Sequence, residues 1–145
     1  MLEKLKKEIW SHFKQTQVVY LATSGKKRPR VRPVTLIHLD EKFYIATGTK
    51  DAKMKQIKNN KNIEFCYPIT DGKNSGYIRG VGRAIVIKDI PLKKKIMGII
   101  PFIKKFWQKP DDPKFTLLGI KIRRGQYLKI GEFKIEKFKI AKSKK

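Results

Sequence analysis

With 145 residues, 40% of them hydrophobic and 10% aromatic, the chain is long enough for one domain with a packed core, and general disorder is excluded. One cysteine excludes an internal disulfide, and with two histidines it leaves no zinc cluster. A net charge of +24 attracts polyanions. We expect a cytoplasmic protein, because the sequence has neither a signal peptide nor the roughly 18 apolar residues of a membrane-spanning helix.

The predicted elements of the first half are mainly short strands. Apolar residues at helical spacing predict an amphipathic helix over residues 2–16. Strands are predicted over residues 18–23, 31–38 and 42–47, the last two joined by a turn at 39–42. A helix over residues 52–59 follows, with Asp51 as its N-cap. Next come strands at 63–67, closed by Pro68, and at 77–88, where Gly80 and Gly82 indicate a bulge or a close approach.

In the second half, Pro91 begins a helical segment over residues 92–107, interrupted at Gly98 and Pro101, with a lysine face and an apolar face. We expect it to pack on the barrel, although a membrane-surface helix has the same profile. A hairpin around residues 123–125 and an edge strand over 133–140 complete the pattern. Residues 1–140 are therefore expected to form a single mainly β domain, a six- or seven-stranded antiparallel barrel with helical decoration, followed by a basic disordered tail at 141–145.

Between residues 32 and 57 the predicted strand, turn, strand and helix can seat a phosphate group. Gly48 lets the backbone approach a ligand, and the start of the helix offers free N–H groups. Hydroxyl and basic side chains, which we expect to be exposed, converge on the same place: Arg32, Thr47, Thr49, Lys50 and Lys53. Each of these residues alone has a purely structural explanation, so the prediction of an anion site depends on their convergence.

The chain resembles the pyridoxamine 5′-phosphate oxidase-like family of FMN-binding split barrels. An ordered set of short segments, spread over roughly residues 5–130, carries the resemblance: VVYLATSG (18–25), RPV (32–34), FYIAT (43–47), KMKQIKNNKNI (53–63), GVGRA (80–84) and FTLLGI (115–120). It implies a split barrel and a homodimer with FMN at the subunit interface. The arginine-containing substrate segment of the true oxidase has no match in residues 133–145, so the resemblance does not extend to that activity.

The resemblance also implies roles for individual residues. The phosphate contacts fall on Arg32 and Lys53, with Gln56 one helical turn later. The flavin ring would lie along the backbone of Val34 and Thr35, with Ala46 and Thr47 on the next strand. Many members have Ser-Arg where this chain has Asp51-Ala52. A carboxylate would repel phosphate there unless it caps the helix, and Lys50 is the candidate to replace the missing arginine charge.

These features predict an FMN-binding oxidoreductase that reduces a small electrophilic or quinone-like molecule, with a nicotinamide as one candidate electron donor. No catalytic side chain and no metal ligand is predicted, because the chemistry would belong to the flavin. Deazaflavin or heme in the same groove stays open. The alternative is a non-catalytic basic module for nucleic acid or an anionic membrane surface. Because the lysines are spread along the chain, we expect nucleic-acid binding that is at most non-specific.

Overall fold

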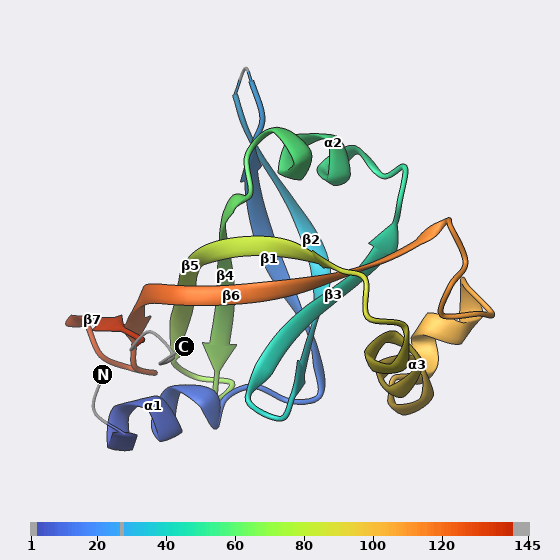
Figure 1. Cartoon of the computed structure of the whole chain (residues 1–145). Coiled ribbons are helices and arrows are strands. Elements are labelled where there is room, and N and C mark those ends of the chain that lie inside the picture. The colour runs from blue at the N-terminus through green and yellow to red at the C-terminus, as the bar shows by residue number, and fades with distance from the viewer. Residues whose placement is uncertain (1–2, 27, 141–145) are drawn as a thin grey trace.

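The computed structural model describes residues 3–26 and 28–140 (Figure 1). Within these residues, seven strands form one antiparallel sheet in the order β3-β2-β1-β4-β5-β6-β7, and pairing of β3 with β6 closes the first six into a barrel. The predicted mainly β barrel is therefore confirmed. The strands are β1 (Thr16–Ser24), β2 (Pro29–Leu39), β3 (Lys42–Gly48), β4 (Asn62–Thr70), β5 (Ser75–Ile87), β6 (Phe115–Leu128) and β7 (Ile135–Lys139). The helices are α1 (Glu3–Trp10), α2 (Ala52–Asn59), α3 (Ile90–Ile99) and the short 3-10 helix η1 (Pro101–Lys105).

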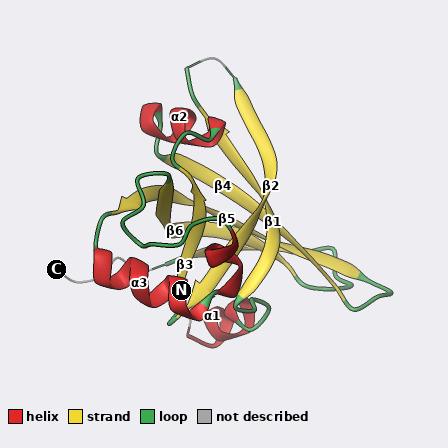
Figure 2. Cartoon of the chain, turned by 90° about the vertical axis from the view of Figure 1, so that its right-hand side faces the viewer, coloured by secondary structure: helices red, strands yellow, loops and turns green. Residues whose placement is uncertain are grey.

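The barrel interior is filled by alternate residues of the strands, as the two-residue period of a strand requires. Leu36 of β2, for example, belongs to the interior cluster, whereas its neighbour Ile37 lies on the outer face. Helices α1 and α2 lie at opposite ends of the barrel (Figures 1 and 2). Each contributes buried apolar side chains to the interior cluster, among them Ile9 of α1 and Met54 of α2.

A second apolar cluster lies on the outer face of β2, β3 and β6. Ile96 and Ile100, at the end of α3, pack there with Tyr44 and Leu117. The segment after β5 thus covers the barrel wall. It is interrupted at Pro101, as predicted, and forms two helices, whereas Gly98 lies within the first of them. Helix α3 is capped at Ile100, and Pro101 opens η1. Among residues 3–26 and 28–140, no helix is both long and apolar enough to cross a membrane.

The ends of α1 and β4 differ from the prediction. Helix α1 ends at Trp10, well before residue 16. Strand β4 continues through Pro68, which is tolerated because β4 pairs with β1 only from Ile63 to Cys66 and has β5 as its neighbour beyond that point.

The predicted hairpin around residues 123–125 is wrong, since β6 runs unbroken through them. Gly125 permits close packing there, because a Cβ atom would lie 2.0 Å from the carbonyl oxygen of Arg79. The glycine pair in β5 behaves as predicted, with a register shift between Val81 and Gly82. The predicted tail at 141–145 lies outside the described residues.

The barrel is split between β2 and β3. Asp40 and Glu41 form the turn between these strands with φ of 50° and 62°, the left-handed geometry of a two-residue hairpin loop. Along the described length of both strands, β2 pairs with β3 only at Ile37, His38 and Leu39. Farther from the turn, β2 pairs with β1 and β3 with β6. Helix α2 begins directly after β3, at this opening.

Candidate functional site

The short loop after β3 is ordered by the N-cap of α2. The Asp51 carboxylate accepts a hydrogen bond from the backbone N–H of Lys53 at 3.1 Å, and its own φ and ψ are extended. Helix α2 then covers residues 52–59, as the sequence predicts, and Asn60 ends it. The cap places the first turn of α2 across the split from β2.

Lys53 is buried, with 8% of its surface exposed, although we expected the basic residues of this site to be exposed. Its Nζ donates to the hydroxyl of Thr47 at 2.7 Å and lies 2.9 Å from Oδ1 of Asp51. Lysine is almost never this buried unless it is paired. The pairing with Asp51 therefore explains how the chain tolerates an ammonium group at the end of β3.

Arg32 reaches α2 from the other side of the split. Its guanidinium donates to Oε1 of Gln56 at 2.6 Å and to the carbonyl oxygen of Leu21 at 3.2 Å. The same Gln56 oxygen accepts from the hydroxyl of Thr23 on β1 at 2.5 Å. Gln56 therefore ties α2 to β1 and β2. Sequence reasoning missed Thr23, because a threonine inside a strand has nothing to set it apart.

The pKa values of this cluster reflect its mixed charges. Burial lowers the pKa of Arg32, while the charge of Asp51 opposes that shift. Burial alone would raise the pKa of Asp51, but the hydrogen bonds from Lys53 and the charges of Lys53 and Arg32 outweigh it and lower the pKa. The group thus holds two cations and one carboxylate, and a net positive charge remains at the split.

The structure brings some of the predicted site residues together and places the others elsewhere. Arg32 contacts Gln56, and Lys53 contacts Thr47 and Asp51. Because the charge of Arg32 also acts on Asp51, we call these five residues the split cluster. Val34 lies two residues after Arg32, on the same face of β2, and packs against the barrel interior.

The other predicted residues face elsewhere. Thr35 alternates with Val34, which places it on the outer face. Ala46 packs on the outer cluster. Lys50 is exposed, and it lines a separate cavity. The hydroxyl of Thr49, expected at the anion site, donates to the carbonyl oxygen of Pro113 at 2.8 Å.

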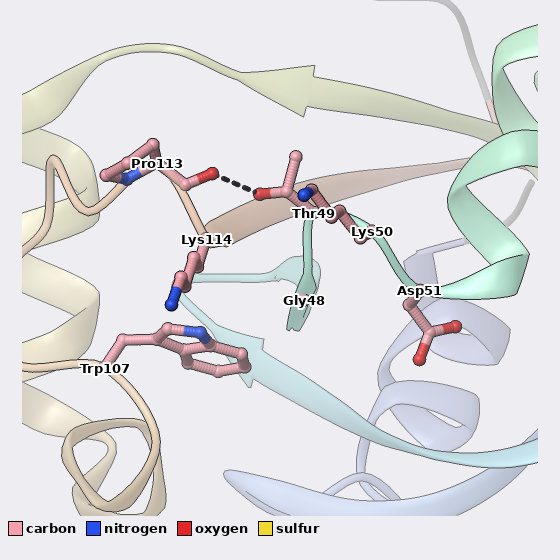
Figure 3. Close-up of a pocket in the computed structure, with 7 residues that line it drawn as sticks. All are labelled: Gly48, Thr49, Lys50, Asp51, Trp107, Pro113 and Lys114. Atoms are coloured by element: carbon pink, nitrogen blue, oxygen red, sulfur yellow. Dashed lines mark hydrogen bonds between the residues drawn. The ribbon is translucent and has the colours of Figure 1, made fainter.

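That cavity, of about 540 Å³, lies beside the split cluster and shares Asp51 with it (Figure 3). Its lining residues are Gly48, Thr49, Lys50, Asp51, Trp107, Pro113 and Lys114. Trp107 and Lys114 were not predicted as site residues, because only the fold brings the segment between η1 and β6 next to the end of β3. A smaller basic cavity of about 150 Å³ adjoins Gln56 on the other side, lined by Gly25, Lys26, Arg28, Arg30, Lys55, Gln56 and Asn59.

The fold and the cluster define a class of protein: an antiparallel barrel split between two strands, with basic and hydroxyl side chains gathered where a helix follows the split. The sequence model of the family described as Pyridoxamine 5′-phosphate oxidase matches residues 5–129, and the chain belongs to this family. The resemblance inferred from the sequence is thereby confirmed. No curated protein sequence matches the chain significantly.

Solved structures share the fold. General Stress Protein 26 from Bacillus anthracis str. Sterne is 24% identical over 94% of this chain and 98% of its own, with a TM-score of 0.75. A NimC/NimA family protein from Clostridium acetobutylicum is 24% identical over 94% and 91%, with a TM-score of 0.72. A heme binding protein from Mycobacterium smegmatis is 14% identical over 86% and 53%, with a TM-score of 0.71. At these identities the likeness is one of fold.

Proposed function

We propose that the chain binds FMN at the split and serves as an oxidoreductase for a small electrophilic or quinone-like substrate. The observation that carries the proposal is the split cluster itself. A lysine of α2 and an arginine of β2 both act on the carboxylate that caps α2, and this single carboxylate offsets their charge. Such a place favours a phosphate group, because charge-assisted hydrogen bonds and the helix N-terminus act together.

The residues fit the cofactor in the following way. Arg32 and Lys53 would hold the phosphate, with the hydroxyl of Thr47 beside Lys53 and the exposed Lys50 close by in sequence. Gln56 keeps the guanidinium in place through its 2.6 Å hydrogen bond. The ring would lie along the backbone of β2 at Val34 and Thr35 and of β3 at Ala46, where the two strands part. When bound, FMN supplies hydride transfer, and the protein supplies binding and orientation.

Asp51 is the feature that sets this site apart from many family members. In this structure it caps α2 and contacts Lys53 at 2.9 Å. Phosphate binding would thus draw Lys53 away from a carboxylate that remains nearby. We therefore infer a weaker FMN affinity than the same cluster would have with serine at this position.

A second copy of the chain is the proposed partner. The outer face of β1 and β2 carries an apolar strip in which Val18, Tyr20 and Val31 are 57%, 47% and 69% exposed. The register places Tyr20 opposite Pro33, next to Arg32 of the split cluster. Two molecules with a net charge of +24 repel each other. An uncharged strip bordering the site is the surface on which they can pair most easily.

Flavin is favoured over heme by the positions of the two histidines, since histidine is a common heme ligand. His12 lies at the opposite end of the barrel from α2, with Nε2 3.1 Å from the hydroxyl of Tyr127. His38 lies beside the β2–β3 turn and stacks on Phe43 at 4.4 Å between ring centroids. Neither ring takes part in the split cluster.

The absorption spectrum of the purified protein and an FMN titration followed by flavin fluorescence test the proposal. We expect flavin bands, or quenching of added FMN with micromolar or tighter affinity. A colourless protein that does not quench FMN at low salt overturns the proposal, and so does a Soret band. In that event the alternative function, a non-catalytic basic binding module, remains. Its binding to nucleic acid or anionic vesicles should fall steeply as the salt concentration rises.

A further inference from the structure

The cavity beside the split cluster has walls that are fixed to each other. The backbone N–H of Thr49 donates to the carbonyl oxygen of Lys114 at 2.9 Å. The Thr49 hydroxyl lies 2.8 Å from the carbonyl oxygen of Pro113 and 2.9 Å from the hydroxyl of Thr116. These contacts join the end of β3 to the segment that enters β6, so the cavity exists before a ligand binds. Its volume of about 540 Å³ suits a small molecule, since such sites occupy about 300–1,000 Å³.

Trp107 gives this cavity an aromatic wall. Its ring stacks on Phe115 with 5.1 Å between centroids and 26° between planes, which fixes its orientation. The indole remains partly exposed and lies beside the side chain of Lys114 in the cavity (Figure 3). A planar aromatic ligand can stack on such a ring, and aromatic pairs are more favourable than the area that they bury would give alone.

The charge around the cavity is positive. Lys50 and Lys114 are exposed, and no ion pair involves either of them within the described part of the chain. The one carboxylate in the lining is Asp51, and it is already paired with Lys53. Among the lining residues, an anionic group on a ligand would therefore find two unpaired cations and one carboxylate that Lys53 already engages. The nearby carboxylate of Asp112 accepts from the backbone N–H of Lys114 at 2.9 Å and does not line the cavity.

We propose that this cavity binds a planar aromatic anion, with the ring against Trp107 and the anionic group between Lys50 and Lys114. This ligand is the substrate class of the proposed oxidoreductase, and its role as a substrate rests on that function. The cavity shares Asp51 with the split cluster, which would place the ligand next to the cofactor. Binding itself requires no flavin, so it is tested separately.

Calorimetric titration of the full-length protein, without added flavin, with 1,4-naphthoquinone-2-sulfonate tests the proposal. We expect Trp107→Leu and Lys114→Ala each to weaken binding about fivefold or more, and uncharged 1,4-naphthoquinone to bind at least tenfold more weakly than the sulfonate. Lys109→Ala is the matched control, because it removes an exposed lysine of the same segment that does not line the cavity. If Lys114→Ala and Lys109→Ala lose the same affinity for the sulfonate, the attraction comes from the overall positive charge, and the proposal is overturned. Equal affinity for the sulfonate and for uncharged 1,4-naphthoquinone would overturn it as well.

A second titration separates this proposal from the proposed function. With FMN at saturation, the sulfonate should still bind; displacement by FMN would mean that the cavity belongs to the cofactor, and the proposal would fail. If the protein binds no FMN yet binds the sulfonate through Trp107 and Lys114, the proposed function fails while the aromatic anion site stands. If FMN binds and the sulfonate does not, the proposed aromatic anion site fails while the proposed function stands.

Discussion

Lys53 donates twice toward one carboxylate: its backbone N–H lies 3.1 Å from Oδ1 of Asp51 and its Nζ 2.9 Å from the same oxygen. The contact caps α2 and offsets the charge of a buried lysine. Without Asp51 the ammonium group would retain only the hydroxyl of Thr47, and an unpaired buried charge is costly. The same carboxylate repels any phosphate that approaches Lys53.

Replacing Asp51 with serine should therefore strengthen FMN binding. Serine is also a good N-cap, so α2 should keep its start. Removing a negative charge about 4 Å from a phosphate relieves about 1 kcal/mol even in water, which corresponds to about fivefold in affinity. Fluorescence titration with FMN measures the change.

Asp89 provides the control for this substitution. It caps α3 by accepting from the N–H of Leu92 at 3.3 Å, as Asp51 caps α2. Asp89→Ser changes the net charge by the same amount, away from the split cluster. If Asp89→Ser strengthens FMN binding as much as Asp51→Ser, the gain comes from overall charge and the assignment of the phosphate site is wrong.

The lowered pKa of Asp51 makes its contribution to stability dependent on pH. Burial opposes the shift, and the contacts with Lys53 and Arg32 outweigh it. A carboxyl group whose pKa is lower in the folded state stabilises the protein above its ordinary pKa and loses that effect as the pH falls. The stability difference between the wild type and Asp51→Asn should therefore shrink as the pH drops below 3.8. Urea unfolding on both sides of this value tests the expectation, which a constant difference would contradict.

Loss of either cation should weaken FMN binding. Arg32→Ala and Lys53→Met each remove a charge-assisted contact worth about 1.5–3 kcal/mol, which corresponds to about tenfold to a hundredfold in affinity. Methionine retains most of the buried stem of Lys53, and so limits the cost in stability.

Lys58→Met is the control for these two variants, since Lys58 lies on α2 and is exposed. An equal loss of affinity in Lys58→Met would show that the attraction is a diffuse field effect. Circular dichroism of each variant without FMN checks that α2 and the barrel remain folded.

The elements around the split were predictable because their patterns are local. Alternating strands, a two-residue turn and an aspartate before a helical stretch specify β2, β3 and α2 within a residue or two. The sequence could not show that Lys53 is buried, because its burial depends on the distant strands that surround it. Gly125 was misread as part of a turn, since the close approach of Arg79 and Phe138 is a tertiary contact.

The cavity could not be predicted from local sequence either, because distant segments form it. Trp107 and Lys114 join Gly48 only because β3 pairs with β6, from Phe43 against Ile120 to Gly48 against Phe115. Nothing in the local sequence around Trp107 distinguishes a cavity wall from a residue that packs in the core.

Tyr20→Glu should disrupt the proposed dimer. The substitution places a carboxylate in the middle of the apolar strip on β1 and β2, where a second copy would have to bury it. Sedimentation equilibrium should show a dimer for the wild type and a monomer for the variant. Phe133→Glu is the control, because Phe133 is 99% exposed and lies outside the strip. A monomeric wild type, or a dimer that persists in Tyr20→Glu, would contradict the proposed interface.

The end of the barrel opposite α2 depends on the hydroxyl of Tyr127. This hydroxyl donates to Glu8 at 2.7 Å and lies 3.1 Å from Nε2 of His12, and the residue is only 1% exposed. Tyr127→Phe should lower the free energy of unfolding by about 1–3 kcal/mol, because it leaves partly buried polar groups unsatisfied. Urea denaturation gives the value. Tyr77→Phe serves as the control, since the Tyr77 hydroxyl has no hydrogen bond within the described residues.

We expect the stabilising effect of the Tyr127 hydroxyl to be lost in alkali. Burial, and then the hydrogen bond to Glu8, raise the pKa of Tyr127. Because the tyrosine is harder to ionise in the folded state than in the unfolded chain, its contribution is complete below the ordinary pKa of 10.0 and is lost as the pH rises above it. The stability difference between the wild type and Tyr127→Phe should therefore narrow above that pH. If the difference stays constant across this range, the hydroxyl does not hold α1 against β6 in the way described.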